Sequence, residues 1–267
     1  MTEAPLWQRA LNREQWIVAI VLVLAIVLAW VSLVSMSMTG ESAGMTPTDS
    51  MSAMASPIVW TASYATMVFA MWAVMMVAMM LPSAAPMILL YARVAGQASQ
   101  EGSVLAPTFV FAGSYLALWA LFALAATGAQ WGLSGYHLLS DATMAVGDRR
   151  VGGALLIGAG LYQLTPLKRI CLSNCRSPIF FLTTHWRAGI GGAIRLGIAH
   201  GAYCIGCCWL LMTLLFFGGV MNLAWVAAIA VIVLVEKAIA VGDRAGQIAG
   251  GLAILAGTVS ILAPTVI

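Results

Sequence analysis

Long uninterrupted apolar runs recur along this sequence, and they limit what the chain can fold into. Residues 16–35, for example, contain no charged side chain. Each run is about 20 residues long, the length of a membrane-crossing helix, whereas the strands of a membrane barrel are about 10 residues long and alternate in polarity. Because every backbone polar group must be paired inside hydrocarbon, the runs predict an all-α, polytopic transmembrane helical bundle.

Composition supports the same conclusion and excludes a soluble fold. Of the 267 residues, 62% are hydrophobic and only 8% are charged. A soluble domain carries about 25% charged residues. We therefore expect one transmembrane domain, residues 1–267, in contact with the lipid bilayer. In such a chain a net charge of +3 gives no evidence for a nucleic-acid partner, and we expect none.

The apolar runs predict about seven spans. They cover residues 16–35, 59–91, 104–127, 151–164, 195–221, 223–241 and 246–264. With the N-terminus in the cytoplasm, Arg149 and Arg150 are the only two of the 12 basic residues that fall outside. The positive-inside rule favours this orientation in a bacterial inner membrane. It makes 36–57 an extracytoplasmic Met-rich linker and 165–195 a cytoplasmic basic loop.

The fifth predicted span carries four side chains with metal-binding chemistry: His200, Cys204, Cys207 and Cys208. At about 100° per residue they fall within an arc of roughly 100° on one helix face. Thiols with an imidazole suit copper(I) best and zinc as an alternative. The competing interpretation is that the cysteines are buried as small apolar side chains.

The second predicted span carries a methionine cluster: Met75, Met76, Met79 and Met80. Thioethers are soft ligands for copper(I), although methionine also fills gaps in a core. Pro82 and Pro86 each remove a backbone donor, which predicts a kink there. We expect the cluster to face the cysteines of 195–221, and we expect the methionines of 36–57 to collect copper outside.

Ionisable residues within or beside the spans suggest two further roles. Glu236 could orient His200 or relay protons with Lys237; alternatively, Lys237 reaches the interface and Glu236 pairs with it or with Arg244. Cys171 and Cys175 lie among basic residues, which favours thiolate and hence metal exchange or redox reactivity on the cytoplasmic side.

Five segments carry a resemblance to a known family. They are MWAVMMVAMMLPSAAP (71–86), YQLTPLKRICLSNCRSP (162–178), HGAYCIGCCWLLM (200–212), GGVMNLAW (218–225) and Glu236–Lys237. In these segments the chain resembles a bacterial family of uncharacterised, predicted metal-binding integral membrane proteins. The resemblance implies a membrane location, a bound metal and no established enzymatic activity.

These observations favour a membrane protein that binds copper(I) for transport, storage or delivery. Its partners would be the metal ion and a metallochaperone or a larger membrane complex. No phosphate-binding Gly-rich loop is present, which argues against nucleotide-driven pumping, and we assign no catalytic residue. Two alternatives stay open: a membrane thiol oxidoreductase, and a non-catalytic subunit of a larger complex.

Overall fold

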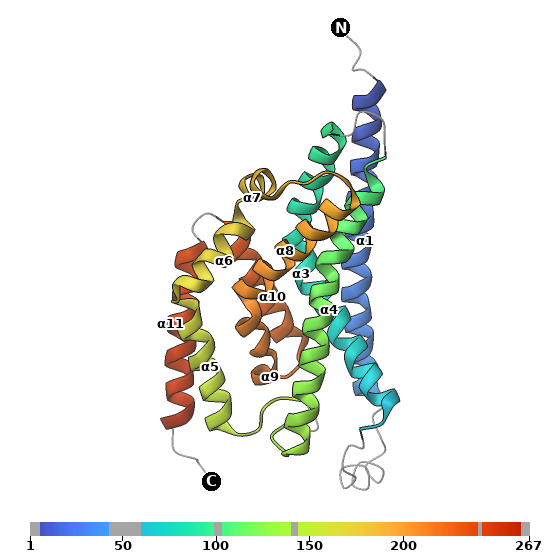
Figure 1. Cartoon of the computed structure of the whole chain (residues 1–267). Helices are drawn as coiled ribbons and strands as arrows, with labels where there is room; N and C mark the ends of the chain where they lie inside the picture. The colour runs from blue at the N-terminus through green and yellow to red at the C-terminus, as the bar shows by residue number, and fades with distance from the viewer. Residues whose placement is uncertain (1–5, 43–59, 99–102, 140–143, 240–241, 263–267) are drawn as a thin grey trace.

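The computed structural model describes residues 6–42, 60–98, 103–139, 144–239 and 242–262, and this part of the chain is helical with no β-strand (Figure 1). The helices are α1 (Leu6–Ser42), α3 (Ala62–Ala98), α4 (Leu105–Gly135), α5 (Arg149–Gln163), α6 (Pro166–Arg176), α7 (Pro178–His185), α8 (Gly189–Thr213), α9 (Leu215–Gly218), α10 (Leu223–Ala238) and α11 (Gly242–Leu262). The all-α prediction is confirmed for these residues.

Five helical segments are long and apolar enough to cross a membrane. They are Arg13–Met38, Ala62–Gly96, Leu105–Gly135, Gly189–Gly218 and Arg244–Leu262. Helices α5 and α10, at 15 and 16 residues, correspond to two further predicted spans but are shorter than the roughly 20 residues a bilayer requires. The architecture is consistent with a membrane protein, while seven spans and a cytoplasmic N-terminus stay predictions.

The long helices pack in a chain of neighbours: α1 against α3, α3 against α4, and α4 against α8 (Figure 1). Helix α8 also packs against the short helix α6, and α5 pairs with α11. Outward faces are apolar; on α1, for example, Leu24 and Leu28 are more than half exposed. Such faces suit a lipid environment, and the buried faces meet around α8.

Two glycines set how closely α8 approaches α4. A β-carbon at Gly197 would lie 2.4 Å from the carbonyl oxygen of Phe111, and one at Gly201 would lie 3.1 Å from Leu118. This spacing of small residues, four apart, lets helix backbones come together inside a membrane. The close approach brings the α4 side chains to the same face of α8 that carries the cysteines.

The segment predicted as a basic loop contains two short helices. The Thr165 hydroxyl oxygen accepts a hydrogen bond from the Lys168 backbone N–H at 3.3 Å, and Pro166 follows at the first helical position. Both are helix-starting signals, and Pro178 begins α7 in the same way. Residues 165–195 therefore contain two short helices and the start of α8. That this segment is a cytoplasmic connection between spans stays a prediction.

Helix α3 continues through Pro82 and Pro86. The Ser83 hydroxyl donates to the Met80 carbonyl oxygen at 2.9 Å, in the region where the prolines remove backbone donors. Of the predicted Met-rich linker, Met36 and Met38 lie at the end of α1 and are exposed, whereas 43–57 lie outside the described residues.

Candidate metal centre

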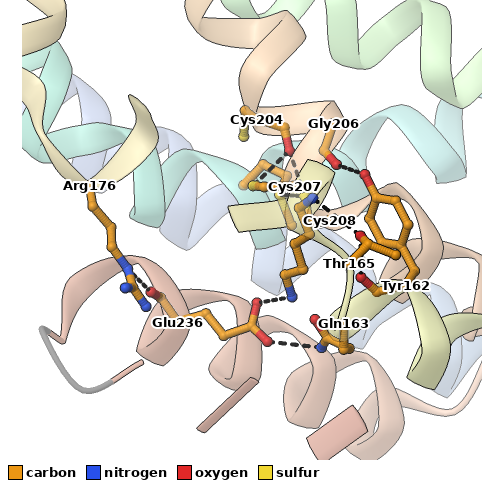
Figure 2. Close-up of polar contacts among 11 residues, drawn as sticks. Tyr162, Gln163, Thr165, Arg176, Cys204, Gly206, Cys207, Cys208 and Glu236 are labelled. Carbon is orange, nitrogen blue, oxygen red and sulfur yellow. Dashed lines mark hydrogen bonds and ion pairs between the residues drawn. The ribbon is translucent and has the colours of Figure 1, made fainter. Parts of the chain in front are cut away.

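The four predicted ligands on α8 all face the protein interior. Cys204, Cys207 and Cys208 are each 1% exposed, and His200 is 4% exposed. Figure 2 shows the three cysteines on neighbouring turns of the helix. All five cysteines of the chain are free thiols. The face of α8 that the sequence singled out is therefore directed at other helices.

Met80 is the member of the methionine cluster that contacts a described thiol. Its Sδ atom lies 3.9 Å from the Sγ atom of Cys208. Met75, Met76 and Met79 are equally buried in the same core, without a described contact to a cysteine. Sulfur atoms from α3 and α8 thus meet inside the bundle.

Helix α6 brings the remaining two cysteines to the same place. The Cys175 thiol lies close enough to the thiols of Cys204 and Cys207 to interact with both. A β-carbon at Gly206 would lie 2.8 Å from the Sγ atom of Cys171, so this glycine leaves room for that side chain. The sequence analysis treated Cys171 and Cys175 as a separate exchange pair, whereas the structure joins Cys175 to the thiols of α8.

The α6 thiols do not have the electropositive environment that their basic neighbours suggested. Burial raises the pKa of Cys171 above its ordinary value. Interactions with the thiols of Cys204 and Cys207, together with burial, raise the pKa of Cys175. Both groups therefore favour the protonated thiol, which corrects the expectation of thiolates at these two positions.

Two polar side chains contact the Cys204 sulfur, and neither is identifiable as a partner from sequence spacing. The Tyr115 hydroxyl of α4 lies 3.0 Å from the Cys204 Sγ atom and 3.4 Å from the Met80 carbonyl oxygen. The Lys237 ammonium of α10 donates to Cys204 Sγ at 2.9 Å and to the Ser83 hydroxyl at 3.2 Å. Side chains of α4 and α10 therefore meet at a sulfur atom of α8, and each also bonds to α3.

His200 lies among aromatic rings. Its ring centroid is 5.4 Å from that of Tyr115 and 5.5 Å from that of Phe181. Its Nδ1 atom is buried and has no hydrogen-bond partner among the described residues. A buried imidazole nitrogen without a hydrogen-bond partner can bind a metal ion. His200 would do so with an ion close to Nδ1, or after a change of rotamer.

Among the described residues, the Glu236 carboxylate forms no hydrogen bond or ion pair with His200, Lys237 or Arg244. Its carboxylate accepts hydrogen bonds from Lys168 Nζ at 2.6 Å and from Gln163 Nε2 at 2.9 Å (Figure 2). Its backbone carbonyl oxygen accepts from Arg176 Nε at 2.6 Å. The buried pair between Lys168 and Glu236 therefore fixes the cysteine-bearing helix α6 to α10. The sequence analysis missed Lys168 in this role, because it counted the residue only as part of a basic cluster.

The donor set fits a soft ion better than a hard one. The thiols of Cys207 and Cys208 both donate to the Cys204 carbonyl oxygen, at 3.1 and 2.9 Å. Within the described ranges, no three Cys, His, Asp or Glu side chains form a ready set of metal ligands. Thiols that now bond to the backbone must rotate to bind an ion, and Met80 adds a thioether, a ligand that copper(I) accepts readily.

Comparison with known protein families identifies the family to which the chain belongs. No curated protein and no solved structure matches it. A family model matches residues 69–260, which is most of the chain and includes Met80 and all five cysteines. The model is described as PpoB2, copper chaperone. The chain therefore belongs to the PpoB2 copper chaperone family.

Proposed function

We propose that this protein is a membrane-embedded chaperone that binds copper(I) in a sulfur cluster made by Met80, Cys204, Cys207 and Cys208, and passes it on. The observation that carries the proposal is the buried contact between Met80 and Cys208, which places thioether and thiol sulfurs of two helices together. Copper(I) prefers this ligand combination over the oxygen ligands that harder ions require. Zinc is the expected competitor.

Cys175 and Cys171 give the ion a route away from α8. Because Cys175 lies beside Cys204 and Cys207, it can bind the ion before one of these two ligands releases it. Cys171 lies one helical turn earlier on α6. We propose that a receiving metallochaperone or membrane complex takes copper(I) at α6, and that the methionines of 36–57 collect it on the extracytoplasmic side of a bacterial inner membrane.

The direct experiment is copper analysis of protein purified in detergent under reducing conditions from copper-supplied cells. We expect about one or more copper ions per chain. The triple variant Cys204→Ser/Cys207→Ser/Cys208→Ser should lose the copper, whereas Met67→Leu, at a position that is 58% exposed on α3, should keep it. Metal-free wild-type protein, or full loading of the triple variant, would contradict the proposal.

A second candidate, a thiol oxidoreductase, is favoured by one observation: the thiols of Cys175 and Cys204 belong to different helices and lie close enough to interact. Trapping thiols in cells with an alkylating reagent distinguishes the two functions. Reversible, redox-dependent pairing of Cys175 supports the oxidoreductase, and thiols that stay reduced while they bind copper support the chaperone.

A further inference from the structure

Lys237 directs a positive charge at the sulfur cluster. Its Nζ atom is 2.9 Å from the Cys204 Sγ atom and 3.2 Å from the Ser83 hydroxyl oxygen. The adjacent residue, Glu236, points in a different direction from α10, where Lys168 holds its carboxylate at 2.6 Å. The two neighbouring residues therefore serve different sites: Glu236 fixes α6, and Lys237 faces sulfur.

The ammonium of Lys237 has no carboxylate among its described hydrogen-bond partners. A charge inside a protein is stable when an opposite charge lies beside it. Lys168 has Glu236 for this purpose, and the group beside Lys237 that can become an anion is the Cys204 thiol. Lys237 and Cys204 are therefore suited to form an ammonium–thiolate pair at the centre of the cluster.

The charge of this pair bears on which ion the cluster accepts. A copper(I) ion carries one positive charge, so a centre in which two of the three cysteines bind as thiolates and the third stays a neutral thiol is a monoanion. A zinc(II) ion between the same thiolates forms a neutral centre. One fixed ammonium neutralises the copper(I) centre but leaves one excess positive charge on the zinc(II) centre, and excess charge is unfavourable where the surrounding dielectric constant is low.

We propose that Lys237 is the fixed counter-cation of the sulfur cluster, and that its charge makes the cluster select a monovalent soft ion over a divalent one. The inference rests on the proposed function, because it assumes that the cluster binds copper(I). It extends that function by assigning metal selectivity to a residue that is not itself a ligand. Lys237 acts through the charge balance of the cluster, so we class it as a positioning and selectivity residue.

The test compares copper(I) and zinc(II) affinities, each measured by competition with a chromophoric chelator on full-length protein in detergent. Lys237→Gln should weaken copper(I) binding by about tenfold or more, because it removes a charge a few ångströms from the cluster. Zinc(II) affinity should stay unchanged or rise, so the ratio of the two affinities falls. Lys237→Arg keeps the charge and should keep the ratio.

Three further variants separate the effect of charge from an effect on folding. Ser83→Asp leaves Lys237 in place but supplies a carboxylate beside its ammonium, and it should also lower the copper-to-zinc ratio, whereas Ser83→Asn should not. Arg169→Gln removes one positive charge from an exposed position of α6 and serves as the matched control. Melting temperatures of all variants show whether an affinity change follows from unfolding.

The outcomes distinguish this inference from the proposed function. Equal loss of both affinities in Lys237→Gln means that the residue only supports the fold, and an unchanged ratio in both Lys237→Gln and Ser83→Asp means that charge does not select the ion. Either result overturns the counter-cation role. Failure of the wild-type protein to bind copper(I) would instead overturn the proposed function.

Discussion

Two interfaces in this molecule are built in opposite ways. Between α5 and α11 the backbones meet directly: a β-carbon at Gly160 would lie 2.6 Å from the Gly250 carbonyl oxygen, and one at Gly257 would lie 2.6 Å from the Gly153 carbonyl oxygen. Around the sulfur of Cys204, by contrast, long side chains from α3, α4 and α10 fill the space between helices. The first interface leaves no room for a ligand.

In a chain that is apolar almost throughout, this difference distinguishes an interface that holds helices together from one that is proposed to bind a metal ion. Close backbone contact through small residues is a general way to hold helices together in a membrane, where burial of apolar surface does not drive association. Thiols, a thioether, a hydroxyl and an ammonium buried at one point are not needed for packing alone, because buried polar groups are unfavourable unless they are satisfied. We therefore expect the sulfur cluster, and not the glycine interface, to carry the proposed function.

The largest effect should come from breaking the ion pair that joins α6 to α10. Lys168→Met leaves the buried carboxylate of Glu236 without its charge partner, and we expect a loss of about 3–5 kcal/mol in the free energy of unfolding. The double variant Lys168→Met/Glu236→Met should lose less than the single one. Denaturant titration in detergent measures both; a double variant less stable than Lys168→Met would contradict the assignment.

The glycine interface should respond next, and in stability alone. Gly160→Ala places a methyl group 2.6 Å from both the Gly250 carbonyl oxygen and Ile254. Overpacking of this kind destabilises by roughly 1–3 kcal/mol. Gly158→Ala, on the same helix with nothing within 4 Å, should be neutral or stabilising. Copper(I) affinity should be unchanged in both variants. A specific loss of affinity in Gly160→Ala would contradict the conclusion that this interface has only a structural role.

Met80→Leu tests the thioether at the sulfur cluster. It keeps the side-chain volume, so stability should change by less than about 1.5 kcal/mol. Copper(I) affinity should fall about tenfold, because a soft ligand is removed from the Cys208 contact. Met67→Leu is the matched control on the same helix, and equal affinities for the two variants would remove Met80 from the proposed ligand set.

Tyr115→Phe should have the smallest effect. The hydroxyl is hydrogen-bonded with Cys204 and lies 3.4 Å from the Met80 carbonyl oxygen, and its loss should lower the free energy of unfolding by about 0.5–1.5 kcal/mol. Tyr136→Phe, at a position that is 80% exposed, should have no measurable effect. Thermal unfolding compares the two, and an unaffected Tyr115→Phe variant would show that this contact adds no stability.

The sequence predicted those parts of the site that lie on one helix and missed those that depend on how helices pack. His200 and the three cysteines of α8 repeat at helical spacing, so their common face follows from helix geometry. That Met80 belongs opposite them was expected only from its depth. Nothing in local spacing indicates that Lys237 turns to Cys204 while Glu236 turns to Lys168, because the two neighbours point about 100° apart and the surrounding helices decide their partners.

For the fold, too, the sequence predicted what depends on local properties and missed other features. Hydropathy is a local property, and it correctly placed the long helices. Helices α6 and α7 lie in the segment expected as a basic loop, because neither has an apolar run long enough to mark a membrane span. The starting signals, Thr165 followed by Pro166 and then Pro178, were present in the sequence, and they would have predicted both helices.

The central claim is that sulfur atoms of α3 and α8 bind one copper(I) ion inside the bundle. X-ray absorption at the copper edge, on protein purified with its copper, tests it most directly. We predict a first coordination shell dominated by sulfur that loses a sulfur ligand in Met80→Leu and disappears with the copper in the triple variant of Cys204, Cys207 and Cys208. A shell of nitrogen and oxygen, or a sulfur shell untouched by these substitutions, would contradict the claim.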